Sequence, residues 1–283
     1  MSYRVIDLHV HVQPLEMFKP EALELIRRGR KDFDQLVEWF RSPAKFVALL
    51  DSIEVERAAL INYVSPDVIG FTPEVNDWVA KYAAPFPKRL IAVGSVHPRY
   101  VSDAAGEVDR LVTLGIRMLK VHPPHQLLYP NEYRQGLGTQ AAIYERAQHH
   151  NLPVMFHTGT SVFPGARNIY ADPLFVDDVA VDFPRLRIIL AHGGRPLWMN
   201  NAFFIVRRHP NVWMDISSIP PHRLLEYFPR LEEIARKVLY GSDWPGPSVA
   251  SMPANMDAIC RLNLSDKAKS MIFYDNAAAL FPL

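Results

Sequence analysis

Eight short apolar runs, each followed by a segment with helical spacing, fill most of this chain of 283 residues. The first run leads into the stretch 7–11, and the others lie at 58–64, 90–96, 116–121, 152–156, 187–191, 212–216 and 237–240. Helical segments 20–30 and 33–50 follow the first run, and those at 74–83, 102–114, 139–150, 173–182, 196–208 and 223–236 follow the next six. We expect further helices at the C-terminus, after the eighth run. Apolar strands that alternate with helices indicate a parallel sheet covered by helices. Eight such units in about 250 residues match the closed (β/α)8 TIM barrel, with an open doubly wound sheet as the alternative.

Composition favours one globular domain over residues 1–283. A hydrophobic content of 49% and a charged content of 22% are typical of a folded domain, and no Gly/Ser-rich linker divides the chain. The net charge of +1 indicates neither nucleic acid nor a membrane surface as partner. The single cysteine, Cys260, excludes an intramolecular disulfide and a cysteine-based zinc site. We expect a cytoplasmic protein, because neither a secretory signal nor an apolar run near the ~20 residues of a membrane span is present.

Asp7, His9 and His11 alternate along the end of the first strand. Because alternate side chains of a strand share a face, we expect these three to point the same way. Two neutral imidazoles side by side form half of a metal site, since they offer nitrogen donors without charge repulsion. The alternative is a pair of ordinary core or surface histidines.

Three later strands also end in a potential ligand, namely His157, His192 and Asp243. Each follows a short apolar run and precedes loop residues. In a (β/α)8 barrel the carboxyl ends of all strands meet at one mouth, where active sites lie. We therefore expect these residues to meet His9 and His11, although more than 230 positions separate the first from the last.

Together these motifs resemble the amidohydrolase superfamily, in the amidohydrolase 2 branch that includes aminocarboxymuconate-semialdehyde decarboxylase. The resemblance covers nearly the whole chain and rests on residues 7–11, 156–159, 183–194, 211–217, 240–245 and 276–281. The branch contains metal-dependent hydrolases, lactonases, hydratases and nonoxidative decarboxylases. It therefore implies the fold and a metal site, but not the substrate.

By position, the resemblance implies one divalent metal held by His9, His11, His157 and Asp243. Zinc is the expected ion, because it suits imidazoles with one carboxylate, and Mn2+ or Fe2+ are alternatives. His192 resembles the family's strand-6 histidine, which acts as a base or oxyanion stabiliser. Asp243, or His192, would take a proton from water and later protonate the leaving group.

Lys120 lies near the end of the fourth strand and shares the phase of His122. Many amidohydrolases carry a carbamylated lysine on that strand, which bridges two metals. Because the branch usually holds one metal, we expect instead an unmodified lysine that pairs with a carboxylate or contacts substrate. Asp7 is expected below the metal, where it would orient a ligand imidazole.

Loop residues after the strands predict a small anionic substrate. Arg167 and Arg195 carry planar guanidinium groups that suit bidentate hydrogen bonds to a carboxylate. His122 and Trp244 are further candidate substrate contacts, although each of these four can equally be a surface or packing residue. The loop 160–172 is a candidate lid.

These features predict a hydrolase that uses metal-activated water on an amide, ester or lactone bond of a small carboxylate-bearing substrate. The alternative is a nonoxidative decarboxylase of an unsaturated or aromatic acid. Some such decarboxylases replace the first strand-1 histidine by glutamate, whereas His9 is retained here. A non-catalytic metal-binding protein is the third reading. The resemblance also allows a homodimer, because these decarboxylases often need an arginine from a neighbouring subunit.

Overall fold

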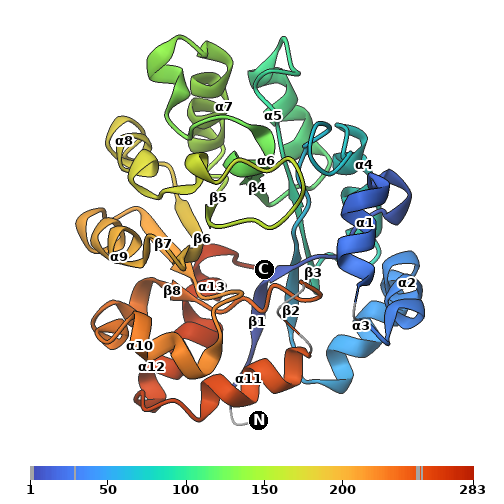
Figure 1. Cartoon of the computed structure of the whole chain (residues 1–283), viewed down its shortest axis with the longest axis vertical. Coiled ribbons are helices and arrows are strands. Elements are labelled where there is room, and N and C mark those ends of the chain that lie inside the picture. The colour runs from blue at the N-terminus through green and yellow to red at the C-terminus, as the bar shows by residue number, and fades with distance from the viewer. Residues whose placement is uncertain (1–2, 29, 247–248, 250) are drawn as a thin grey trace.

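A parallel eight-stranded barrel forms the centre of the molecule (Figure 1). The structure, a computed structural model, describes residues 3–28, 30–246, 249 and 251–283. Its strands follow one another around the sheet in chain order. They are β1 (Ile6–Val10), β2 (Arg57–Leu60), β3 (Leu90–Gly94), β4 (Met118–Val121), β5 (Val154–Gly159), β6 (Ile188–Arg195), β7 (Val212–Asp215) and β8 (Val238–Leu239).

The barrel closes where the chain after β8 lies against β1. The backbone N–H of Leu8 donates to Tyr240 O at 3.0 Å, and that of Asp243 donates to His9 O at 2.8 Å. These bonds join the last strand to the first, which an open sheet does not do. The predicted (β/α)8 barrel is thus confirmed, and the doubly wound alternative is excluded.

Most helices surround the strands on the outside of the ring, whereas α13 (Asn276–Leu280) lies near the centre of the view (Figure 1). They are α1 (Pro20–Arg27), α2 (Phe33–Arg41), α3 (Pro43–Ser52), α4 (Glu74–Ala83), α5 (Ala104–Thr113), α6 (Pro123–Gln126), α7 (Gly138–His149), α8 (Leu174–Asp182), α9 (Met199–Arg208), α10 (Leu224–Tyr227), α11 (Met252–Cys260), α12 (Asp266–Ser270) and α13 (Asn276–Leu280). Within the described ranges, no helix has the length and hydropathy that a bilayer crossing requires.

Two of the predicted helices are divided in the structure, and proline explains both. The segment 33–50 forms α2 and α3, because Pro43 has no N–H to continue a helix. The Ser42 hydroxyl accepts the N–H of Lys45 at 3.3 Å and caps the new helix. The segment 223–236 forms α10 and a 3-10 helix at Leu231–Lys237, with Pro229 between them.

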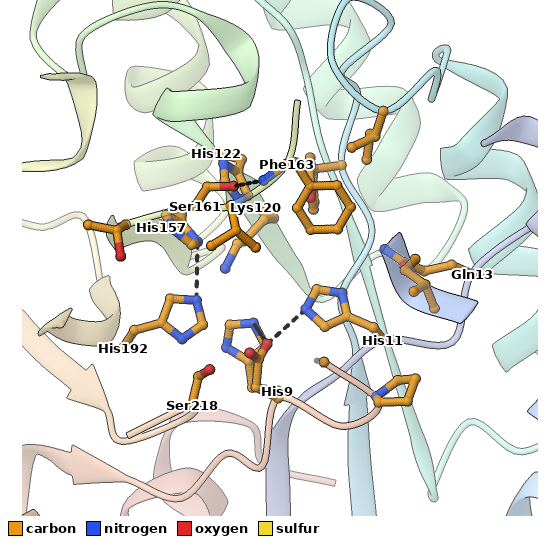
Figure 2. Close-up of a pocket in the computed structure, with 18 of the residues that line it drawn as sticks. His9, His11, Gln13, Lys120, His122, His157, Ser161, Phe163, His192 and Ser218 are labelled. Atoms are coloured by element: carbon orange, nitrogen blue, oxygen red, sulfur yellow. Dashed lines mark hydrogen bonds and ion pairs between the residues drawn. The ribbon is translucent and has the colours of Figure 1, made fainter. Parts of the chain in front are cut away.

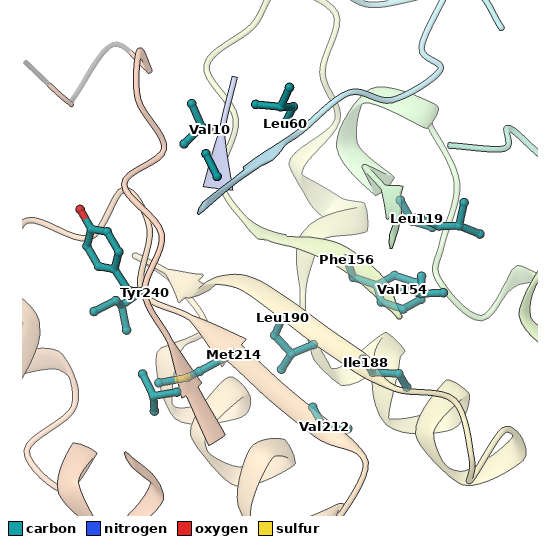
Figure 3. Close-up of a cluster of buried hydrophobic side chains, with 14 of the residues drawn as sticks. Val10, Leu60, Leu119, Val154, Phe156, Ile188, Leu190, Val212, Met214 and Tyr240 are labelled. Atoms are coloured by element: carbon teal, nitrogen blue, oxygen red, sulfur yellow. The ribbon is translucent and has the colours of Figure 1, made fainter. Parts of the chain in front are cut away.

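The strands pack apolar side chains on both faces, as parallel strands do. Outward residues such as Leu60, Val154 and Leu190 pack under the helices (Figure 3). Inward residues include Met118 and belong to a second cluster that contains α13 side chains. Lys120 follows Met118 by two positions and therefore shares the inner face of β4.

The pairing of β1 with β2 shifts by one residue before the metal motif. Asp7 lies opposite Ala58 and Val10 lies opposite Leu60, so β1 contains one extra residue between them. The shift places Asp7 on the outer face with Val10, whereas His9 lines the barrel mouth. The prediction that Asp7 shares a face with the two histidines is therefore wrong, because a one-residue shift reverses side-chain direction.

Candidate metal and active site

A cavity of about 220 Å³ opens at the carboxyl ends of the strands (Figure 2). Its polar wall comes from several strand ends and consists largely of His9, His11, Lys120, His122, His157, His192, Arg195 and Asp243. Its apolar wall includes Phe18, Ile26, Phe40, Ile69 and Phe163. Polar groups that converge in an apolar pocket are typical of a small-molecule site.

His9, His192 and Asp243 form the centre of the polar wall. Each offers one ligand atom, and these atoms all lie within 4.8 Å of one another. The Nε2 atom of His9 is buried without a hydrogen-bond partner and lies 3.4 Å from Asp243 Oδ1. A buried nitrogen left free beside a carboxylate fits a metal ligand. The donor set therefore suits a divalent cation, zinc among others.

His11 and His157 each contact one residue of this central group. His11 Nε2 is 3.0 Å from Asp243 Oδ1, and His157 Nδ1 is 3.1 Å from His192 Nε2. The structure thus brings together all five residues that the sequence placed at the mouth. His192, expected as the base, lies nearer to the centre than His157, expected as a ligand, and the division of roles between them stays a prediction.

Asp215, at the end of β7, contacts both His9 of β1 and His192 of β6. Its Oδ2 is 2.7 Å from His9 Nδ1, and its Oδ1 accepts the backbone N–H of His192 at 2.9 Å. The Ser217 hydroxyl donates to Asp215 and lies 2.8 Å from His192 Nδ1. The contact at His9 Nδ1 leaves Nε2 to face the cavity.

This role was expected of Asp7, and that expectation is wrong. Asp7 Oδ1 accepts the backbone N–H groups of His9 and Ser242 at 3.1 and 2.9 Å and contacts no imidazole. Sequence reasoning missed Asp215, although it ends an apolar strand in the same way as His157. Its place at the carboxyl end of an apolar strand is the sequence signal that could identify it.

Burial sets the protonation of the central groups. It lowers the pKa of His9, and it lowers those of His157 and His192 far below the ordinary value. Burial opposes ionisation of Asp243, but the hydrogen bond with His11 and the positive charge of Arg195 hold its pKa well below the usual range. The site therefore combines neutral imidazoles with an ionised carboxylate, which is the state that binds metal.

Two residues of this central group occupy unusual backbone conformations. His192 and Asp243 have φ values of +64° and +66°, in the left-handed region that β-strand residues seldom enter. Strain of this kind clusters at functional sites. Gly241 makes room for the same site, because a Cβ there would lie 2.7 Å from the Cβ of His9.

Lys120 projects from β4 into the centre of the site (Figure 2). The residue is 1% exposed, and its Nζ has no hydrogen-bond partner among the described residues. Burial lowers its pKa to about 8, against the opposing pull of Asp215 and Asp243. In the described residues, Lys120 therefore forms no hydrogen bond with a carboxylate, although one was expected. Carbamylation of Lys120 stays an untested alternative.

The four predicted substrate residues lie in different places. Arg195 and His122 line the cavity. Among the described lining residues, neither Arg167 nor Trp244 appears. Trp244 is 3% exposed and stacks on Phe46, which places it in the core between barrel and helices. The backbone N–H of Arg167 donates to Pro124 O at 2.9 Å, which anchors that loop.

The candidate lid is tied to the barrel. Ser161 and Phe163 line the cavity, and the Ser161 hydroxyl lies 2.7 Å from His125 Nε2. The other ring nitrogen of His125 lies 3.1 Å from the hydroxyl of Tyr63, which follows β2. This chain joins the loop to the barrel wall and was not predicted.

Residues 6–283 match the family model described as Amidohydrolase. The chain belongs to the amidohydrolase family. No curated protein matches this amidohydrolase in sequence.

Solved structures with the same fold cover nearly all of this amidohydrolase. An uncharacterized TIM-barrel protein from Bordetella bronchiseptica shares 19% identity at a TM-score of 0.76, over 98% of this chain and 97% of its own. A probable 2-pyrone-4,6-dicarboxylic acid hydrolase from Acinetobacter baumannii, with citric acid bound, shares 16% at 0.68, over 99% and 100%. A 5-carboxyvanillate decarboxylase from Novosphingobium aromaticivorans, complexed with manganese, shares 18% at 0.67, over 100% and 97%. The fold of this amidohydrolase thus occurs in hydrolases and decarboxylases.

Proposed function

We propose that this amidohydrolase is a metal-dependent hydrolase of an amide, ester or lactone bond in a small carboxylate-bearing substrate. The observation that carries the proposal is the position of the Asp243 carboxylate at the cavity wall, where its ligand oxygen lies within 4.8 Å of ring nitrogens of His9 and His192. A carboxylate in that position can accept a proton from a water molecule at the site.

A divalent cation is the cofactor that fits these residues. His9, His11, His157 and Asp243 would hold it, and His192 lies beside them. Such a cation, when bound, acts as a Lewis acid and lowers the pKa of a water molecule towards about 7. Zinc suits the donor set, and the manganese of the 5-carboxyvanillate decarboxylase supports Mn2+ as an alternative.

Asp243, His192 and Arg195 would each have a separate role in hydrolysis. Asp243 accepts the proton of the attacking water and returns it to the leaving group. His192, held through Nδ1 by Ser217, presents Nε2 to the site and stabilises the developing oxyanion. Arg195 holds the substrate carboxylate. The apolar wall excludes bulk water, which strengthens each of these contacts.

Decarboxylation of an unsaturated or aromatic acid is the second candidate. The flat side chains of Phe18, Phe40 and Phe163 form an apolar wall suited to a planar acid. A decarboxylase among the similar structures supports the same reading. His9, which some decarboxylases of the branch replace by glutamate, favours hydrolysis.

Isotope labelling separates the two reactions. The zinc- or manganese-loaded protein is assayed with lactones, esters and amides of small acids, and with aromatic acids, in 18O-labelled water. We expect 18O in the product without carbon dioxide, loss of turnover in Asp243→Asn, and full turnover in the exposed control Asp34→Asn. Carbon dioxide release without 18O incorporation would establish the decarboxylase instead, and turnover of no compound would contradict both.

A further inference from the structure

Three arginines contact the C-terminal segment at the base of the barrel, the end opposite the cavity. Arg57 is the first residue of β2, and Arg117 and Arg187 immediately precede β4 and β6. Each donates to one of three successive backbone carbonyls: Arg187 Nη1 to Leu280 O at 3.1 Å, Arg57 Nη1 to Phe281 O at 2.6 Å, and Arg117 Nη2 to Pro282 O at 2.8 Å. Guanidinium groups from three separate strands are therefore gathered around one short segment.

Two of these arginines lie on the inner face of the barrel. Arg57 precedes Ala59 by two positions and Arg187 precedes Ile189 by two, and both apolar residues belong to the inner cluster that also contains α13 side chains. β2 and β6 are opposite each other in the eight-stranded ring. The C-terminus lies near the centre of the view in Figure 1. Arg57 and Arg187 therefore approach the C-terminal segment from opposite sides of the base.

These three positive charges are close together and lack a carboxylate partner. Among the described residues none of the three forms an ion pair, and Glu56, next to Arg57 in the sequence, pairs with Arg4 at 2.8 Å instead. Burial, and then the positive charge of Arg117, lower the pKa of Arg187. Backbone carbonyls satisfy individual N–H groups but carry no net charge. The cluster therefore keeps an excess of positive charge.

The two inner arginines also keep unused hydrogen-bond donors. The Nε atoms of Arg57 and Arg187 are buried without a hydrogen-bond partner among the described residues. Arg57 is only 4% exposed, so its guanidinium has little access to water. Arg187 is half-buried and Arg117 is exposed, so an ion can approach from solvent. A buried cation with a free donor is unfavourable unless a counter-ion is bound.

We propose that Arg57, Arg117 and Arg187 form a binding site for a small tetrahedral oxyanion, inorganic phosphate in chemical class. Guanidinium groups donate paired hydrogen bonds to phosphate oxygens, and donors from three directions suit a tetrahedral anion better than a planar carboxylate. The bound anion would connect the first turns of three strands to the C-terminal segment and stabilise the folded chain. The site is at the opposite end of the barrel from the cavity, so it is independent of the proposed function.

Thermal unfolding of the zinc-loaded, desalted protein tests this site. At pH 7 and equal ionic strength, we expect the unfolding midpoint in about 20 mM inorganic phosphate to exceed that in chloride by at least about 3 °C. Arg117→Gln and Arg187→Gln should each lose most of this shift. The exposed control Arg261→Gln should keep it, and so should Arg195→Gln, which removes a cation of the cavity.

Equal midpoints in phosphate and chloride would overturn the inference, as would a phosphate shift that survives both substitutions at the base. A shift that only Arg195→Gln abolishes would also overturn it, because the anion would then bind in the cavity. Arg117 is exposed, so Arg117→Gln is expected to fold even if Arg187→Gln does not. Equilibrium dialysis with radiolabelled phosphate should show at least about tenfold weaker binding to Arg117→Gln than to the wild type, and equal binding would contradict the site.

Discussion

The Nδ1 atom of His9 lies 2.7 Å from Oδ2 of Asp215, and this contact decides which nitrogen of the ring faces the cavity. The other oxygen of Asp215 accepts the backbone N–H of His192. One carboxylate from β7 therefore orients a ligand of β1 and positions the end of β6. Such partners of metal-binding histidines fix the tautomer and raise the basicity of the ring.

Asp215→Asn should weaken metal binding while the barrel stays folded. The amide keeps the shape of the side chain but cannot hold the His9 ring through a charged contact, and losses of about 10–100-fold in metal affinity are typical. Zinc affinity from competition with a chromogenic chelator measures the effect, with Asp34→Asn as the exposed control. An unchanged zinc affinity in Asp215→Asn would contradict this role.

Gly241→Ala should displace His9 and thereby disturb the metal site. The added Cβ would lie 2.7 Å from the Cβ of His9, so the ligand must move. We expect a loss of about 1–3 kcal/mol in the free energy of unfolding, together with weaker metal binding. The matched control is Gly138→Ala, where no atom lies within 4 Å of the new Cβ. Equal urea midpoints for the two variants would rule out this steric account.

Lys120→Met should stabilise the metal-free protein, and the gain should depend on pH. The pKa of Lys120 falls from 10.5 to about 8 in the folded protein. Below pH 8 the Lys120 ammonium is buried in the folded chain and solvated in the unfolded chain, and this burial lowers the free energy of unfolding by its full amount. The loss declines as the pH rises from 8 toward 10.5, because the folded chain then releases the proton. At about 1.4 kcal/mol per pH unit, this cost is roughly 3 kcal/mol at pH 7.

Urea unfolding at pH 7 and pH 9.5 measures that dependence. The advantage of Lys120→Met over the wild type should shrink by roughly 2 kcal/mol between the two pH values. An advantage that is equal at both, or a variant less stable than the wild type at pH 7, would show that the lysine is not a buried cation.

Ser161→Ala should free the loop that covers the cavity. The substitution removes the 2.7 Å contact with His125, which in turn contacts Tyr63. Amide hydrogen exchange over residues 160–168 should then accelerate several-fold, while β5 stays protected. Uniform acceleration in both segments would indicate global destabilisation, and no change in the loop would show that this contact does not tether it.

The fold and most of the site could be predicted because they rest on periodic features. Alternation of strands and helices predicts the barrel, and barrel closure places every strand end at one mouth. His157, His192 and Asp243 each occupy such an end, so their meeting with His9 required no knowledge of loop structure. Proline at 43 and 229 also carries the information needed to divide two of the helices.

The remaining features depend on geometry that local sequence does not determine. The one-residue shift in β1 turns Asp7 away from the histidines, and only the pairing with β2 reveals it. Asp215 acquires its role through contacts across strands that are far apart in the sequence. Trp244 leaves the mouth because the loop that follows Asp243 turns its side chain onto Phe46, and the direction of a loop side chain has no periodicity from which to predict it.

The zinc content of the chain shows whether these residues form a metal site. Metal-free protein is equilibrated with buffered Zn2+, desalted and analysed by mass spectrometry for zinc per chain, alongside His9→Ala and the exposed control His149→Ala. We predict one zinc per chain in the wild type and in His149→Ala, and almost none in His9→Ala. Retention of zinc by His9→Ala, or no zinc in the wild type, would contradict the account.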